Sequence, residues 1–212
     1  MVIRAVFLDF DGTILDTKKM AEDALVLTLD ELDLDYDKVE AFGLLGTKMR
    51  LILNKLGLKK SRIEFGRELF YKHYINGIVK TGARPCVPLK PLYRLKKNFS
   101  LIVVSNSDVK FLNAAIDKMK IGDLFDEVYG AENGKSKDDV LADVLAKKGL
   151  MAEEAVYVGD RFSDVRFGKK AGMKTVAISN SCSWSSLKEL WKERPDFVVG
   201  NFLELEKVVN SL

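Results

Sequence analysis

The sequence of 212 residues is poor in residues that cross-link a chain or bind a soft metal: it has two Cys, one His, four Pro and no Gln. Cys86 and Cys182 form neither a CxxC pair nor a zinc-ligand spacing, which argues against a disulfide framework or a structural zinc site. The one histidine, His73, falls inside a predicted helix, which excludes a Ser-His-Asp triad and a histidine-based metal site. We therefore expect a protein of a reducing compartment, the cytoplasm.

The sequence also lacks a long hydrophobic run and a strong excess of one charge. The apolar residues 1–8 are followed by Asp9 and Asp11, so this run is too short and too acidic for a signal peptide or a membrane span. Lys and Arg number 34 against 31 Asp and Glu, a net charge of +3, and the two signs are interleaved. We expect neither a membrane nor a nucleic-acid partner, because phosphate-backbone binding needs a concentrated basic surface.

Short apolar runs alternate with helical patterns along most of the chain. This order is typical of an α/β protein, and right-handed crossovers then predict a doubly wound (Rossmann-like) parallel sheet with helices on both faces. The predicted strands are 3–10, 101–104, 127–129, 155–158, 175–178 and 197–199. The predicted helices of this part are 109–119, 137–147, 164–171, 185–192 and 202–209.

The long interval after the first strand has a different pattern. Residues 16–82 contain no convincing strand, but apolar residues recur at helical spacing in 17–32, 48–56 and 61–78. Ser61 and Glu64 have the spacing of a capping box and should begin the third of these helices. The sequence thus predicts an inserted all-helical cap domain, residues 16–82, and an α/β core of residues 1–15 and 83–212.

Polar side chains follow the predicted strands at the edge of the sheet where ligands bind in open α/β folds. They are Asp9 and Asp11 after the first strand, Ser105 and Asn106 after the second, Lys135 before the helix at 137–147, and Asp160 and Asp164 after the fourth. Because these strand ends meet in a parallel sheet, we expect the side chains to share one site.

The residue types of this set indicate its chemistry. Carboxylates from two strands would repel each other unless a cation lay between them, and ligation by oxygen alone favours Mg²⁺. Ser105, Asn106 and Lys135 are donors suited to the charged oxygens of a phosphoryl group. The sequence therefore predicts a magnesium site that binds phosphate.

The same motifs resemble those of the haloacid dehalogenase-like hydrolase superfamily. The resemblance rests on residues 9–13, on the run ending in Ser105-Asn106, on Lys135, and on Gly159-Asp160 with Asp164. It covers the whole chain, and residues 168–175 are similar to phosphoglycolate phosphatase-like members with a helical cap. One departure is that Ser136, not Pro, follows the lysine. Lys135 or Lys137 could therefore contact phosphate, and the spacing to Asp139 favours Lys135.

The resemblance implies a role for each acidic residue. Asp9 would attack phosphorus and become an aspartyl phosphate, and Asp11 would act as general acid and then as general base. The backbone carbonyl of Asp11 would join Asp9 and Asp160 on Mg²⁺. Asp164 would support the metal site from outside by holding water or Lys135.

The cap contains a basic stretch with two interpretations. Residues 41–63 carry six Lys and Arg side chains and no acidic one, which a solvated face would explain. Alternatively, by analogy with the family, Thr47, Lys48 and Arg50 face the active site and determine which substrate binds.

These expectations together predict a Mg²⁺-dependent phosphatase that hydrolyses a small phosphorylated metabolite. A phosphosugar mutase of the same superfamily is the alternative, since it shares Asp9 and Asp11. Dehalogenation is disfavoured because Asp11 is present. A receiver-like signalling module is disfavoured because it places its phosphoacceptor on the third strand and has no helical insertion. The sequence leaves monomer and homodimer equally open.

Overall fold

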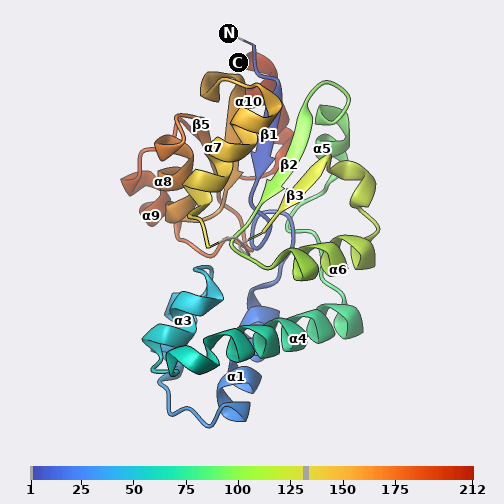
Figure 1. Ribbon diagram of the computed structural model, residues 1–212. Coiled ribbons are helices and arrows are strands. Elements are labelled where there is room, and N and C mark those ends of the chain that lie inside the picture. Colours follow the sequence, from blue (N-terminus) through green and yellow to red (C-terminus); the bar gives the residue numbers. More distant parts are fainter. Residues whose placement is uncertain (1, 131–133) are drawn as a thin grey trace.

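The computed structural model describes residues 2–130 and 134–212. Its centre is a sheet of six parallel strands in the order β3-β2-β1-β4-β5-β6. Figure 1 shows β3, β2 and β1 side by side. The strands are β1 (Ala5–Leu8), β2 (Ser100–Val104), β3 (Glu127–Tyr129), β4 (Ala155–Gly159), β5 (Lys174–Ile178) and β6 (Phe197–Val199). The prediction of a doubly wound parallel α/β sheet is confirmed, and each predicted strand is present within a few residues of its expected bounds.

The central strands are apolar throughout because helices cover both faces of the sheet. On one face, Val6 and Leu8 of β1 belong to the same hydrophobic cluster as buried residues of α5 (Lys90–Leu95), α6 (Val109–Met119) and α10 (Phe202–Ser211). On the other face, Ala5 and Phe7 cluster with α7 (Lys137–Lys148). Helices α8 (Phe162–Lys170) and α9 (Leu187–Lys192) pack beside β5 through Val165, Ala177 and Leu190.

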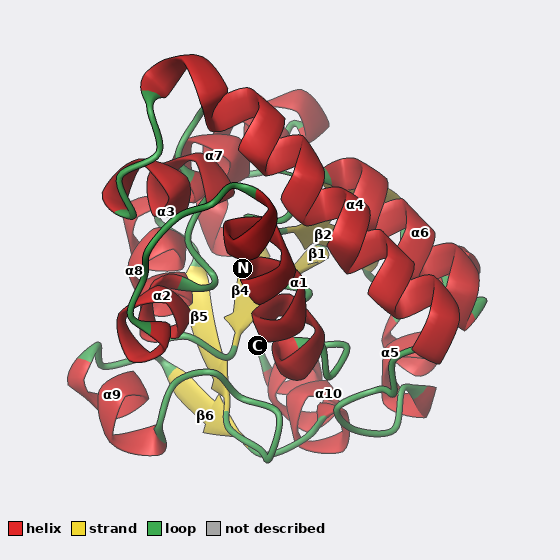
Figure 2. Cartoon of the chain, turned by 90° about the horizontal axis from the view of Figure 1, so that it is seen from below, coloured by secondary structure: helices red, strands yellow, loops and turns green. Residues whose placement is uncertain are grey.

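The chain between β1 and α5 forms a helical layer at the edge where β1 ends. It comprises α1 (Lys18–Glu31), α2 (Lys38–Leu44), α3 (Met49–Lys55) and α4 (Ile63–Thr81). In Figure 2 these helices lie across the end of the sheet, with α4 alongside α6. Residues 16–82 remain our proposed extent of this cap.

Two details of the cap differ from the prediction. A short 3-10 turn (Lys60–Arg62) precedes α4, and Arg62, not Ser61, occupies the N-cap position. The predicted capping box is wrong because Glu64 instead accepts hydrogen bonds from Arg50 and Arg67, and charged donors are the stronger partners. Helices α2 and α5 were missed because six or seven residues are too few to show a helical period.

Two expectations from composition can be compared with the structure. Cys86 and Cys182 are free thiols. Among residues 2–130 and 134–212, no helix combines the length and the apolar character that crossing a membrane requires.

The packing of α8 on the sheet generates a stability prediction. A Cβ on Gly168 would lie 2.7 Å from Thr175 Cγ2 and 3.2 Å from Tyr157 Cβ. The Thr175 hydroxyl is held by Asp196 at 2.7 Å, so this side chain cannot easily turn away. We expect Gly168→Ala to lower the free energy of unfolding in urea by about 1–3 kcal/mol, as overpacking does.

Gly43 of α2 provides the matched control, because a Cβ there would meet nothing within 4 Å. Gly43→Ala should raise the free energy of unfolding by about 0.5–1 kcal/mol, since alanine is the better helix former. Equal effects of the two substitutions would contradict the packing argument.

Candidate active site

Three buried carboxylates converge where β1 and β4 end, at the point where the strand order changes direction. Asp9 follows β1, Asp160 follows β4, and Asp164 lies in the first turn of α8. They are 4%, 0% and 1% exposed, and one oxygen of each lies within 4.8 Å of the others. Ligands bind at this crevice in open α/β sheets. The expected meeting of Asp9 and Asp160 is therefore present in the structure.

The fold fixes the direction of Asp160 and Asp164. Asp160 accepts hydrogen bonds from the Thr13 hydroxyl at 2.9 Å and from the Trp184 backbone N–H at 2.7 Å. Asp164 accepts from the Arg161 backbone N–H at 3.0 Å, as part of a capping box at the start of α8. A Cβ at position 159 would lie 2.4 Å from Asp164 Cβ, so only glycine allows this approach.

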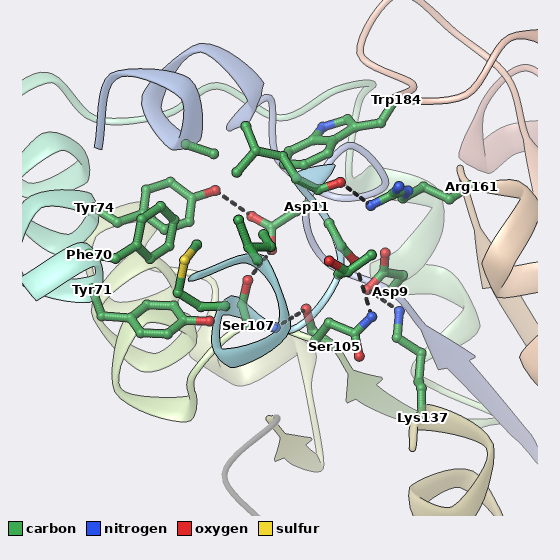
Figure 3. A pocket seen from close by; sticks show the side chains of 17 residues that line it. Asp9, Asp11, Phe70, Tyr71, Tyr74, Ser105, Ser107, Lys137, Arg161 and Trp184 are labelled. Atoms are coloured by element: carbon green, nitrogen blue, oxygen red, sulfur yellow. Dashed lines mark hydrogen bonds and ion pairs between the residues drawn. The ribbon is translucent and has the colours of Figure 1, made fainter. Parts of the chain in front are cut away.

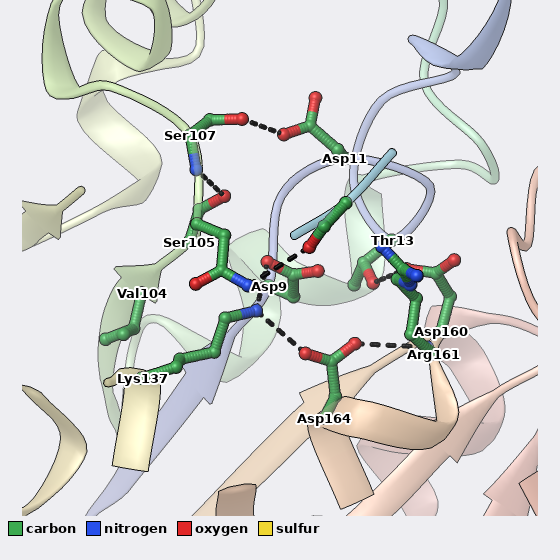
Figure 4. Close-up of polar contacts among 12 residues, drawn as sticks. Asp9, Asp11, Thr13, Val104, Ser105, Ser107, Lys137, Asp160, Arg161 and Asp164 are labelled. Carbon is green, nitrogen blue, oxygen red and sulfur yellow. Dashed lines mark hydrogen bonds and ion pairs between the residues drawn. The ribbon is translucent and has the colours of Figure 1, made fainter. Parts of the chain in front are cut away.

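The structure places Lys137, not Lys135, beside the carboxylates (Figure 4). Lys137 Nζ lies 3.0 Å from Asp9 Oδ1 and 2.7 Å from Asp164 Oδ1, and its side chain is 3% exposed. The side chain of Lys135 is 50% exposed and pairs with Asp143 outside this cluster. Lys137 therefore replaces Lys135 as the candidate phosphate-binding lysine.

The reason for this correction lies in the helix that begins here. Ser136 is the N-cap of α7, its hydroxyl accepting from the Asp139 backbone N–H while the Asp139 carboxylate accepts from Ser136. The spacing to Asp139 that favoured Lys135 thus belongs to a capping box. Lys137 occupies the first position of the helix, where its side chain reaches the site.

The charges of this cluster are out of balance. Burial, and then the charge of Asp164, raise the pKa of Asp9 to about 7, although Lys137 opposes this shift. Burial and the charges of Asp164 and Asp9 also raise the pKa of Asp160 well above its usual value. For Lys137 burial lowers the pKa, but Asp164 and Asp9 outweigh it, so its pKa lies above the usual value. Three carboxylates facing one ammonium can accommodate a divalent cation.

Asp11 lies on the cap side of the cluster and is surrounded by hydroxyl groups (Figure 3). Its Oδ1 accepts hydrogen bonds from Thr17 at 2.7 Å and from Tyr74 at 2.8 Å, and its Oδ2 accepts from Ser107 at 2.6 Å. Burial, and then the charge of Asp11, raise the pKa of Tyr74 well above its usual value, so this phenol is a donor. The carboxylate is therefore held away from the sheet and toward the cap.

The two predicted donors after β2 have different positions. Ser105 is buried and lines the cavity with Asp9, and its Oγ accepts from the Ser107 backbone N–H at 3.1 Å. Asn106 Nδ2 donates to the carbonyl of Gly46 in the cap at 3.1 Å. Ser105 thus lies with the acidic cluster, whereas the Asn106 side chain connects the core to the cap.

Of the three cap candidates, Thr47 lines the cavity that contains Asp9. The ammonium of Lys48 contacts the carbonyl of Lys135, and Arg50 forms an ion pair with Glu64. These two basic side chains contribute to contacts at the edge of the cap. The cap side of the cavity is otherwise apolar and aromatic; it is lined by Ala21, Met49, Ile52, Phe70, Tyr71 and Tyr74.

Several residues of the site were missed by sequence reasoning. Arg161 donates from its guanidinium to the carbonyl of Leu45 at 2.5 Å and lies 5.8 Å from the ring of Trp184. Arg161 and Ser107 are neighbours of recognised motif residues, and this adjacency was the available signal. Tyr74 and Trp184 lie far from any motif in sequence, so nothing in the chain pointed to them.

Comparisons with known proteins agree with this geometry. The family model described as haloacid dehalogenase-like hydrolase matches residues 6–178. The chain belongs to the haloacid dehalogenase-like hydrolase family. A phosphoglycolate phosphatase from Aquifex aeolicus is 31% identical over 99% of this chain and 98% of its own length. One from Pseudomonas fluorescens is 29% identical over 95% of this chain and 78% of its own.

Solved structures of this hydrolase family share the fold. A haloacid dehalogenase-like hydrolase from Streptococcus pneumoniae superposes with a TM-score of 0.81 at 23% identity, over 97% of this chain and 98% of its own. The resemblance inferred from the motifs is confirmed, and the chain is an enzyme of the phosphatase class in this hydrolase family.

The lysine assignment generates a prediction that does not depend on activity. Lys137→Met would leave Asp9 and Asp164 buried without their cation, which typically costs about 3–5 kcal/mol of stability. We expect a loss of this size in urea unfolding without divalent cations at pH 8. Lys135→Met is the control and should leave the free energy of unfolding nearly unchanged, because its ion pair is exposed. A larger loss of stability in Lys135→Met than in Lys137→Met would contradict the assignment of Lys137.

Proposed function

We propose that this protein is a Mg²⁺-dependent phosphatase that hydrolyses a small phosphorylated metabolite through an aspartyl phosphate on Asp9. The observation that carries this proposal is the cluster of Asp9, Asp160 and Asp164, whose oxygens lie within 4.8 Å of one another beside Lys137. Asp9 and Lys137 line a cavity whose other wall is formed by residues of the cap.

The donor set fits Mg²⁺. Buried carboxylate oxygens are hard ligands, and the unbalanced charge that raises the pKa values of Asp9 and Asp160 favours a divalent cation. Asp9, Asp160 and the backbone carbonyl of Asp11 would hold the ion. Asp164 would orient Lys137. When bound, Mg²⁺ supplies positive charge that offsets the carboxylates and the phosphoryl oxygens.

The protein side chains then have defined roles in two steps. A carboxylate oxygen of Asp9 forms a bond to phosphorus while the ester P–O bond breaks, and Asp11 gives its proton to the leaving oxygen. Asp11 next takes a proton from water, whose oxygen displaces Asp9 and releases phosphate. Lys137 and Ser105 donate hydrogen bonds to the phosphoryl oxygens and so stabilise the charge of the transition state.

The cap side of the cavity favours a small leaving group. Bulky side chains from α3 and α4 line this wall, and the neighbouring Arg50 is engaged by Glu64. Phosphoglycolate is the first compound to test, since relatives that span this whole chain are named phosphoglycolate phosphatases.

The activity itself provides the next prediction. Purified protein should release inorganic phosphate from phosphoglycolate and from p-nitrophenyl phosphate with Mg²⁺ and not with EDTA. Asp9→Asn should lower kcat by at least about 10³-fold, because removing a nucleophile removes the covalent route. Asp143→Asn, on the exposed surface, should retain activity. Full activity of Asp9→Asn would refute the nucleophile, and isomerised sugar phosphate without free phosphate would favour the mutase.

Metal binding can be tested without turnover. A ligand at about 100 times its Kd adds about 2.7 kcal/mol of stability, and each kcal/mol raises the Tm of a chain of this size by about 2–4 °C. Mg²⁺ should therefore raise the Tm of the wild type and of Asp143→Asn. It should not raise the Tm of Asp160→Asn, measured against the same variant without metal. An equal Mg²⁺ shift in Asp160→Asn would rule out this ligand set.

A further inference from the structure

Asp11 is held by hydroxyl donors from three separate segments of the chain. Thr17 precedes α1, Ser107 follows β2, and Tyr74 lies in α4 of the cap. Oδ1 accepts from both Thr17 and Tyr74, whereas Oδ2 accepts from Ser107. Tyr74 is the donor among these three that comes from the long cap helix.

The position of the Tyr74 hydroxyl is fixed by aromatic packing on both sides of the boundary between cap and core. The Tyr74 ring stacks on Phe111 of α6 with centroids 3.8 Å apart and planes 11° from parallel. It also packs on Phe70 of its own helix at 5.4 Å. Tyr74 is 2% exposed. The hydroxyl therefore reaches Asp11 when α4 lies on α6.

We propose that Tyr74 is a positioning residue for the general acid Asp11, an inference that rests on the function proposed above. Its hydroxyl orients the carboxyl group toward the cap, which is where the leaving group lies when Asp9 attacks phosphorus from the opposite side. When Asp11 gives its proton to the leaving oxygen, it becomes a carboxylate that accepts the Tyr74 hydrogen bond at full strength. Tyr74 thus stabilises the product of proton transfer.

This role makes the contribution of Tyr74 depend on the leaving group. An alkoxide leaving an alkyl phosphate needs a proton in the transition state, so it needs a well-placed Asp11. The p-nitrophenolate ion is a stable anion and leaves without one. If Tyr74 only held the cap in place, removing its hydroxyl would lower kcat/KM equally for both substrates.

The decisive experiment measures kcat/KM of Tyr74→Phe with phosphoglycolate and with p-nitrophenyl phosphate. This substitution keeps the stacked ring and removes the hydroxyl. Loss of a hydrogen bond to a charged group predicts a fall of at least about 10-fold for the alkyl phosphate. For the aryl phosphate we expect a fall of less than about 3-fold. A thermal unfolding curve confirms that the variant is folded.

Tyr71→Phe is the matched control. Tyr71 lies on the same helix, is also buried and lines the same cavity, and its hydroxyl makes a backbone hydrogen bond at Asp108. Removal of the Tyr71 hydroxyl should change kcat/KM by the same factor for both substrates. Phe111→Leu is a second test, because it loosens the stack but keeps the Tyr74 hydroxyl. It should produce a smaller loss with the same preference for the alkyl phosphate.

A double-mutant cycle separates this proposal from the function on which it rests. Asp11→Asn should itself lower kcat/KM, which reports the formation of the aspartyl phosphate and not its hydrolysis, far more for phosphoglycolate than for p-nitrophenyl phosphate. Adding Tyr74→Phe should then lower kcat/KM little further. If Asp11→Asn shows this selectivity but Tyr74→Phe slows both substrates equally, the positioning role of Tyr74 is overturned and the proposed function stands. If Asp11→Asn is not selective, the acid role of Asp11 fails, and the role of Tyr74 fails with it.

Discussion

The dominant constraint in this structure is the repulsion among three carboxylates that the fold brings together in a buried place. β1 and β4 pair in register, so Asp9 and Asp160 follow adjacent strand ends, and Asp164 is brought in by the capping of α8. Among the described residues, Lys137 is the one lysine or arginine that is buried. Its ammonium offsets part of the charge, and the remainder is what a divalent cation would neutralise.

This constraint explains the residues around the cluster. Asp160 and Asp164 are bound by donors that belong to the backbone or to a short side chain: the Thr13 hydroxyl and the Trp184 N–H for Asp160, and the Arg161 N–H for Asp164. Backbone N–H groups and short side chains have few alternative conformations. The carboxylate oxygens that they bind therefore keep their positions although the carboxylates repel each other. The glycine at 159 is part of the same arrangement, because any side chain there would collide with Asp164.

The sequence was sufficient for the fold and the acidic residues because both follow from short-range signals. Apolar runs identified the strands, and parallel pairing then places Asp9, Ser105 and Asp160 at one edge. The choice of Lys135 was wrong because Ser136 and Asp139 form a helix cap whose spacing resembles that of the motif. Tyr74 could not be predicted, since its contact with Asp11 joins residues 63 positions apart and depends on how α4 packs.

The cap contacts the core through residues that lie next to the acidic cluster in sequence. Asn106 and Arg161, neighbours of Ser105 and Asp160, donate to the carbonyls of Gly46 and Leu45 in the cap. The loop turns at Gly46 with a φ of 84°, a conformation that favours glycine, and a Cβ there would also displace the Arg161 guanidinium. The core residues that bind the cap loop thus directly follow Ser105 and Asp160 in the sequence. The same two strand ends therefore position both the acidic cluster and the contacts to the cap loop.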